Sequence, residues 1–108
     1  MADIGGTTLF TPTPASTISL VVDPSASQIV AAWTAGQAET VSVSGTPANG
    51  QNLTLIITND GTSRTITFGT GFSAAGNIVG VVNKKSVISF LSYNGKFYEN
   101  GRVVGTLT

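Results

Sequence analysis

The sequence predicts an all-β fold, a single antiparallel β-sandwich or jelly-roll-like domain with an extended N-terminal arm. Short runs rich in Val, Ile, Thr and aromatic residues follow one another, and Gly, Asn and Asp separate them. No stretch of about ten residues or more shows a clear 3.6-residue hydrophobic period. The chain has 108 residues, which suits one domain with its own core.

Residues 1–16, "MADIGGTTLFTPTPAS", differ from the rest and form the predicted arm. Pro12 and Pro14 have the spacing of an extended, polyproline-like segment. Two interpretations stay open, a disordered tail and an arm that lies on a neighbouring subunit. The apolar Ile4, Leu9 and Phe10 are unusual for a free tail.

The predicted sandwich occupies residues 17–108 and begins with three short runs, "TISLVVD", "SQIVAAWT" and "ETVSVSG". The alanines of the second run also suit a helix, but its short length and its neighbours favour a strand. The residues expected to face the core are Ile18, Leu20 and Val22, then Ile29, Ala31 and Trp33, then Val41 and Val43.

The next segment, "LTLIITNDGTSRTITF" at residues 53–68, predicts a hairpin that turns at Asp60-Gly61. In that register Leu55 would lie opposite Ile66, and apolar residues would meet apolar residues across the pair. The other face would carry a row of threonines. Hydroxyls can face solvent, a sugar or another subunit at little desolvation cost, and a subunit contact is the simplest choice.

The C-terminal stretch "SFLSYNGKFYENGRVV" contains two Asn-Gly pairs, and each predicts a tight turn. The first turn would pair Tyr93 with Lys96, and the second would pair Glu99 with Arg102. One face would carry Phe90, Phe97 and Val104. The opposite face would carry the candidate subunit-interface residues Leu91, Tyr93, Tyr98 and Val103. Because both faces are apolar, the sheet should be covered on both sides, by this chain or by another subunit.

Composition favours a homo-oligomer without enzymatic chemistry. Charged residues make up only 9% and cancel to zero net charge, so colloidal repulsion is weak. No basic stripe suggests nucleic-acid binding, and no apolar run suggests a membrane span. The chain lacks Cys and His, which excludes thiolate chemistry and most zinc sites. We expect no cofactor, no metal and no catalytic residue, and synthesis in a cytoplasm because no secretory signal is recognisable.

The five carboxylates, Asp3, Asp23, Glu39, Asp60 and Glu99, are scattered along the sequence. Turns or ion pairs account for most of them, Glu39 has no explanation, and nothing marks a glycosidase-like pair. Trp33, Tyr93 and Tyr98 could stack on sugars, but aromatic residues of β modules more often lie in cores or interfaces.

Residues 45–76, "GTPANGQNLTLIITNDGTSRTITFGTGFSAAG", followed by "SFLSYNGKFYE", resemble small bacteriophage virion proteins, namely capsid decoration (cement) proteins and related fibre modules. The shared pattern is a "G-x-P-x-x-G-Q-x-L" opening, an alternating strand, "N-D-G-T", "R-T-I-T-F", a glycine loop with Phe72, and then "Y-N-G". It covers roughly half of the chain and is structural, not catalytic.

The resemblance implies a β-sandwich or jelly-roll domain that forms a homotrimer on the capsid surface and clamps subunits of the major capsid protein. The arm residues Leu9, Phe10, Pro12 and Pro14 would then contact the shell or a sister subunit. The alternative is a tail-fibre or head-fibre module that binds a host surface glycan. A small enzyme or a free carbohydrate-binding module is a third class.

Overall fold

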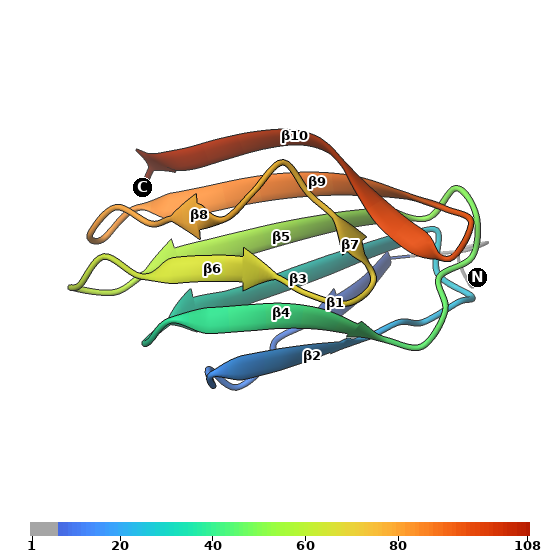
Figure 1. Cartoon of the computed structure of the whole chain (residues 1–108), viewed down its shortest axis with the longest axis horizontal. Coiled ribbons are helices and arrows are strands. Elements are labelled where there is room, and N and C mark those ends of the chain that lie inside the picture. Colours follow the sequence, from blue (N-terminus) through green and yellow to red (C-terminus); the bar gives the residue numbers. More distant parts are fainter. Residues whose placement is uncertain (1–6) are drawn as a thin grey trace.

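The computed structural model describes residues 7–108, in which strands alone form the regular structure and no helix occurs (Figure 1). The all-β prediction is therefore confirmed. The strands form two sheets. The six-stranded sheet contains, in spatial order, β1 (Thr7–Phe10), β3 (Gln28–Ala35), β5 (Asn52–Asn59), β9 (Lys85–Tyr93), β10 (Lys96–Leu107) and β7 (Phe72–Ser73). The four-stranded sheet contains β2 (Thr17–Val21), β4 (Glu39–Ser44), β6 (Thr65–Phe68) and β8 (Ile78–Val79).

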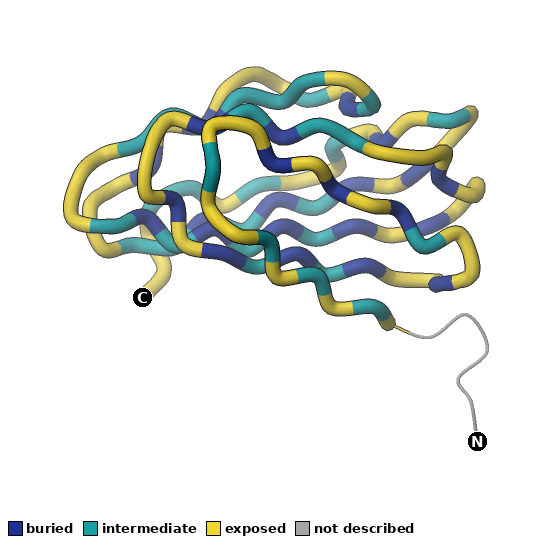
Figure 2. The backbone as a smooth tube through the Cα atoms, turned by 90° about the horizontal axis from the view of Figure 1, so that it is seen from below, coloured by how far each residue is buried: buried dark blue, intermediate teal, exposed yellow. Residues whose placement is uncertain are grey.

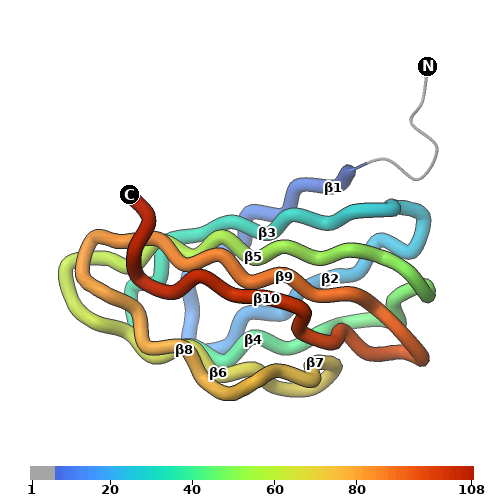
Figure 3. The backbone as a smooth tube through the Cα atoms, turned by 90° about the horizontal axis from the view of Figure 1, so that it is seen from above, coloured from blue at the N-terminus to red at the C-terminus, as the bar shows by residue number. Residues whose placement is uncertain are grey.

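The first six strands alternate between the two sheets, so the chain winds in coils that stack like a short solenoid (Figures 1 and 3). β1, β3 and β5 pair in parallel in one sheet, and β2, β4 and β6 pair in parallel in the other. The purely antiparallel sheets that we expected are therefore wrong. Antiparallel pairing is confined to β5 with β9, β9 with β10, and β6 with β8.

The hairpin predicted at residues 53–68 is also wrong. β5 pairs with β3 and β9, whereas β6 pairs with β4 and β8 in the other sheet. The connection crosses between the sheets, and the buried Asn59 side chain holds it. Its amide nitrogen donates to the carbonyl oxygens of Asp60 and Thr62, and its Oδ1 accepts the backbone N–H of Arg64. The predicted faces remain correct, because Leu55 and Ile66 are both buried.

The first Asn-Gly turn is confirmed. Tyr93 pairs with Lys96, and Asn94 and Gly95 have φ of 54° and 84°, as a tight hairpin turn requires. The second is wrong, because the chain continues through Gly101 as a single strand, β10. The register shifts between Glu99 and Gly101, so this Asn-Gly pair forms a β-bulge.

The core lies between the two sheets and draws on both. Figure 2 shows buried and exposed residues alternating along the strands. The largest side chains that are fully removed from solvent include Phe90, Phe97, Leu20 and Ile29. Four phenylalanines, Phe68, Phe72, Phe90 and Phe97, meet edge-on or tilted, with ring centroids 5.0 to 6.1 Å apart. Burial of each such side chain contributes about 1.5–3 kcal/mol.

The described part of the predicted arm includes a strand. Residues 7–10 form β1, which pairs in parallel with β3 of the same chain at the edge of the six-stranded sheet. Residues 1–6 of the arm, and with them Asp3, lie outside the described residues. The domain boundary between residues 16 and 17 stays a prediction.

Candidate interaction face

The outer face of the six-stranded sheet brings together residues from five strands. Alternation turns every second side chain of each strand away from the core. The registers then align these side chains in rows that cross the sheet. One row contains Ala32, Ile56, Val87 and Val103, and the next contains Gln28, Asn52, Leu91 and Tyr98. We call this surface the outer face.

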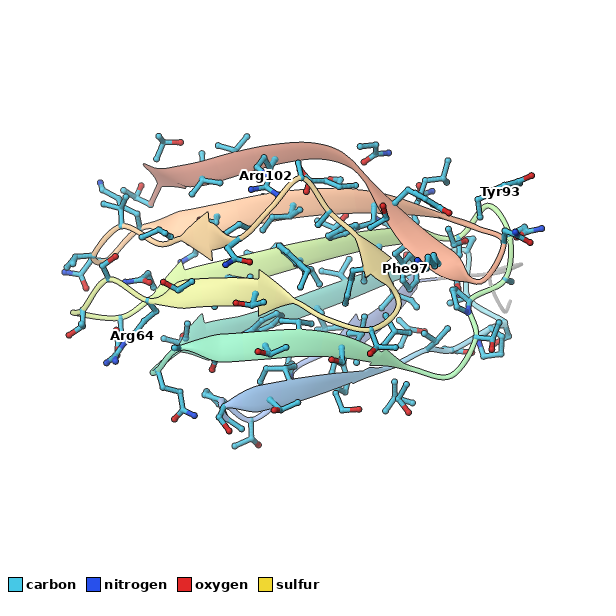
Figure 4. The ribbon with its side chains drawn as sticks, viewed as in Figure 1. Arg64, Tyr93, Phe97 and Arg102 are labelled. Carbon is cyan, nitrogen blue, oxygen red and sulfur yellow. The ribbon has the colours of Figure 1, made fainter. Side chains whose placement is uncertain are left out.

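The four candidate interface residues share the outer face. Their exposed fractions are 42% for Leu91, 65% for Tyr93, 41% for Tyr98 and 45% for Val103. Figure 4 shows Tyr93 at one end of the molecule, projecting away from the strands. Phe90 and Phe97 are buried on the opposite side of the same strands. The sequence therefore sorted the two sides of β9 and β10 correctly, although the second turn does not exist.

Few charges interrupt the outer face. In the part of the chain that the structure describes, its only charged side chains are Lys85 and Lys96, at the starts of β9 and β10. The residues between them are apolar, hydroxyl-bearing or amides. A surface of this kind loses little solvation when it is covered, so it suits a protein contact.

The threonines of residues 53–68 do not form a single wall. Thr54 and Thr58 lie half-buried on the outer face, whereas Thr65 and Thr67 belong to β6 in the four-stranded sheet. Threonine suits a pleated surface that is partly covered, and its hydroxyl costs little to leave there. The hydroxyls of Thr54 and Thr58 are therefore part of the candidate contact surface, and those of β6 are not.

The arm residues take different positions. Leu9 aligns with Val30 of β3 on the outer face and is 66% exposed. Phe10 points the other way and packs against the core. Pro12 is half-buried and Pro14 is exposed, in the connection from β1 to β2. Of the four predicted arm contacts, Leu9 is the one that joins the outer face.

A buried pair that the sequence did not reveal is Trp33 with Glu39. The indole Nε1 donates to Glu39 Oε1 over 2.7 Å, and Glu39 is only 2% exposed. The other carboxyl oxygen, Oε2, has no hydrogen-bond partner within residues 7–108. Burial raises the pKa of Glu39 above its ordinary value of 4.5, and the bond from Trp33 opposes this rise. Since its ring is buried, Trp33 offers no sugar-stacking surface.

Both arginines of the chain form ion pairs with nearby carboxylates. A guanidinium nitrogen of Arg102 lies 2.5 Å from a carboxylate oxygen of Glu99. Arg102 also donates to the carbonyl oxygens of Gly76 and Asn77, and these bonds hold the loop between β7 and β8 against β10. Arg64 binds Asp60 at 3.0 Å in the turn after β5, at the opposite end of the molecule from Tyr93 (Figure 4). The bonds from these arginines lower the pKa of Glu99 and of Asp60.

A hollow of about 220 Å³ lies at the ends of β6 and β7. Its lining residues are Phe68, Phe72, Ser73, Ala74, Gly76 and Asn77. None of these side chains titrates near neutral pH, so none can act as a general acid or base. The hydroxyl of Ser73 therefore has no base in the lining that could activate it as a nucleophile. Over residues 7–108, no three carboxylates, histidines or cysteines gather in a way that could hold a metal ion.

No helix long and apolar enough to cross a membrane occurs within the described range. No protein-family model matches the chain. No curated protein matches it significantly either. The functional proposal therefore depends on the outer face and not on a known relative.

Proposed function

We propose that this protein is a non-enzymatic structural protein of a bacteriophage virion, a capsid decoration protein with a β-sandwich type of domain. The outer face is the single observation that supports the proposal best. It is broad, nearly uncharged and carries exposed Leu91, Tyr93, Tyr98 and Val103. Isolated soluble domains seldom leave such a surface open, because an extended apolar patch promotes association.

The partners in this proposal are sister copies and the major capsid protein. The resemblance implies a homotrimer, and the outer face would supply contacts within it or to the shell. Leu9 lies on the same face as the hairpin residues, so strand β1 could take part in the same contact. Tyrosine combines a large apolar ring with a hydroxyl, which suits a contact that is partly wet.

The proposed action is mechanical. A protein that binds the assembled shell but not its separated parts stabilises the shell by mass action. The gain is about 2.7 kcal/mol per site at a hundredfold excess over the dissociation constant. Many copies on one particle would add to a visible effect on heat stability.

The alternative function is a tail-fibre or head-fibre module that binds a host glycan. One observation favours it: Tyr93 and Tyr98 are both exposed on neighbouring strands near the same turn. Aromatic rings in such positions can stack on sugar rings. The third ring considered for this role, Trp33, is buried and bonded to Glu39.

The test compares heat-induced genome release from complete particles with release from particles that lack this protein. We expect release at a lower temperature without it and recovery when purified protein is added back. A Val103→Lys variant should restore less, because the new charge would be desolvated in the contact. Ser44→Lys, on an exposed residue of the other sheet, is the matched control and should restore fully.

One result would decide against the decoration role, and another would decide against the outer face as its contact surface. If depleted particles are as heat-stable as complete ones but fail to attach to host cells, the fibre function is the correct one. If Ser44→Lys and Val103→Lys lose activity equally, the outer face is not the contact surface.

A further inference from the structure

We propose that the free edges of β1 and β2 pair with the same two edges of a second copy of this chain, about a two-fold axis. The pair forms by strand addition and continues both sheets across the contact. This surface is separate from the outer face, so the inference goes beyond the proposed function.

The two edges lie at the same end of the molecule. β1 is the last strand of the six-stranded sheet, and β2 is the last strand of the four-stranded sheet. Both belong to the first coil of the stack, at the lower side of Figure 1 and toward the viewer in Figure 2. A last strand leaves half of its backbone N–H and C=O groups without a strand partner, which makes it a template for another strand.

Nothing in the sequence of the first coil protects these edges. Residues 7–22 contain no charged side chain, and the prolines lie between the strands, not within them. Natural edge strands usually carry lysine, proline, a bulge or an inward charge that prevents pairing. The apolar Val21 is instead exposed on β2.

The opposite end of the stack is protected in several ways. β7 and β8 have only two residues each. The remaining free edge belongs to β10, and its register is broken between Glu99 and Gly101 and again between Val103 and Leu107. Glu99 and Arg102 form an ion pair there and bind the loop at residues 75–77. Bulges, charges and very short strands are the usual means of blocking edge pairing, and the first coil has neither a bulge nor a charge in strands of four and five residues.

Coil stacking adds a second physical reason for a partner. Each coil in a solenoid-like stack is covered by its neighbours, and terminal coils usually need a polar cap. At the far end, the antiparallel strands β9 and β8 cover the third coil. The first coil has a neighbour on one side only among residues 7–108.

The geometry selects a second copy arranged with two-fold symmetry. An axis normal to the two sheets keeps each sheet in its own layer and reverses the strand direction. It therefore places β1 antiparallel to β1 of the partner, and β2 antiparallel to β2 of the partner, at the same time. Because both edges are uncharged, bringing identical surfaces together produces no like-charge repulsion.

The first measurement is the molar mass in solution, by light scattering during size-exclusion chromatography. A two-fold contact alone gives about twice the chain mass of 11.0 kDa. Combined with a three-fold contact on the outer face it gives six chains. A particle of one chain or of three chains overturns the proposal.

A matched pair of variants locates the contact. Val21 on β2 and Val79 on β8 are both 60% exposed and lie on opposite edges of the four-stranded sheet. Val21→Lys should weaken self-association at least about tenfold, because it puts a charge into the paired edge. Val79→Lys should leave the molar mass unchanged. Equal effects of the two variants would overturn the proposal.

Cross-linking gives an independent readout, since the chain has no cysteine of its own. Ser19 is the middle residue of β2, so a two-fold axis near the centre of that strand brings its two copies close together. Under mild oxidation Ser19→Cys should give a disulfide-linked dimer in high yield, and Val79→Cys should not. Failure of Ser19→Cys to cross-link, in a protein that remains a dimer by light scattering, would place the contact elsewhere and overturn the proposal.

Discussion

The parallel coils of β1–β6 and the hairpin of β9 and β10 both contribute strands to the six-stranded sheet, but they pair those strands in different ways. In the coils, Thr7 pairs with Gln28, and Gln28 pairs with Asn52, across long stretches of sequence. In the hairpin, Tyr93 pairs with Lys96 across a two-residue turn. The hairpin register follows from local turn chemistry, whereas each coil register depends on where the previous coil already lies.

This difference also divides the stabilising interactions. The C-terminal part holds three of the four clustered phenylalanines and the less exposed of the two ion pairs. The coils are stabilised by aliphatic stacking and by polar side chains that hold the connections between sheets. The amide of Gln51, for example, donates to the carbonyl oxygens of Asp23 and Ala26. Paired substitutions, one in each part, test whether the two parts are stabilised differently.

The largest difference is expected between Phe97→Ala and Leu20→Ala, at two residues with no exposed surface. Phe97→Ala should lower the free energy of unfolding by about 3–5 kcal/mol, because it removes a ring from the aromatic cluster. Leu20→Ala should cost about 2–3 kcal/mol, since an edge strand can move inward and reduce the cavity. Urea unfolding of both variants measures this, and a larger loss for Leu20→Ala would contradict the division.

The two ion pairs should differ next. Arg102→Met leaves Glu99, whose side chain is only 8% exposed, without its charge partner, and should cost about 1–3 kcal/mol. Arg64→Met breaks a pair whose side chains are 26% and 31% exposed, and should cost less than about 1 kcal/mol. Thermal unfolding at neutral pH measures both. Equal losses would show that solvent screens the Glu99–Arg102 pair as well.

A smaller difference should separate the glycines of the two Asn-Gly pairs. Gly95 has a φ of 84°, so Gly95→Ala forces a side chain into the left-handed region and should cost about 1 kcal/mol. Gly101 lies in the bulge of β10 without a positive φ, and an added Cβ meets open space. Gly101→Ala should change stability by less than about 0.5 kcal/mol. A similar loss at both positions would mean that the second pair also forms a turn.

The smallest expected effect is a pH slope from the buried carboxyl of the coils. The folded-state pKa of Glu39 is raised, so the folded protein binds this proton more tightly than the unfolded chain does. Stability from Glu39 should therefore be highest below the ordinary pKa of 4.5 and should fall as pH rises through the raised value. Glu39→Gln should flatten this slope in unfolding curves from about pH 4 to about pH 7. An unchanged slope would assign it to another group.

The failed hairpin shows what alternation can and cannot predict. Leu53, Leu55, Ile57 and Ile66 are buried as the pattern requires, and Phe68, predicted on the same face, is partly buried against the core. The same pattern is equally satisfied by β5 and β6 in one sheet or in two. Asn59 decides between them, because its amide holds a connection that crosses from sheet to sheet. Close packing reinforces the choice, since a Cβ added to Gly80 would lie 2.2 Å from Asn59 Oδ1.

The outward side of β9 and β10 was more predictable than the fold around it. The exposed side of β9 and β10 depends only on strand alternation and on one turn, so all four residues were found on one face. The Glu99–Arg102 pair was also expected, although a bulge and not a turn produces it. The partnership of Trp33 and Glu39 had no local signature, because it joins the end of one strand to the beginning of the next across the core.

Local sequence patterns suffice to predict the all-β class, the inward and outward side of most strands and the register of the first turn of the β9–β10 hairpin. These properties depend on side-chain alternation and on turn conformations, and both are set by residues close together in the sequence. Only the tertiary structure decided that β1 to β6 run as parallel coils, that β5 and β6 belong to different sheets, and that the edges of β1 and β2 lie together at one end. Strand partners separated by many residues are chosen by competition for the same backbone groups and the same core, and that competition is resolved only when the whole chain folds.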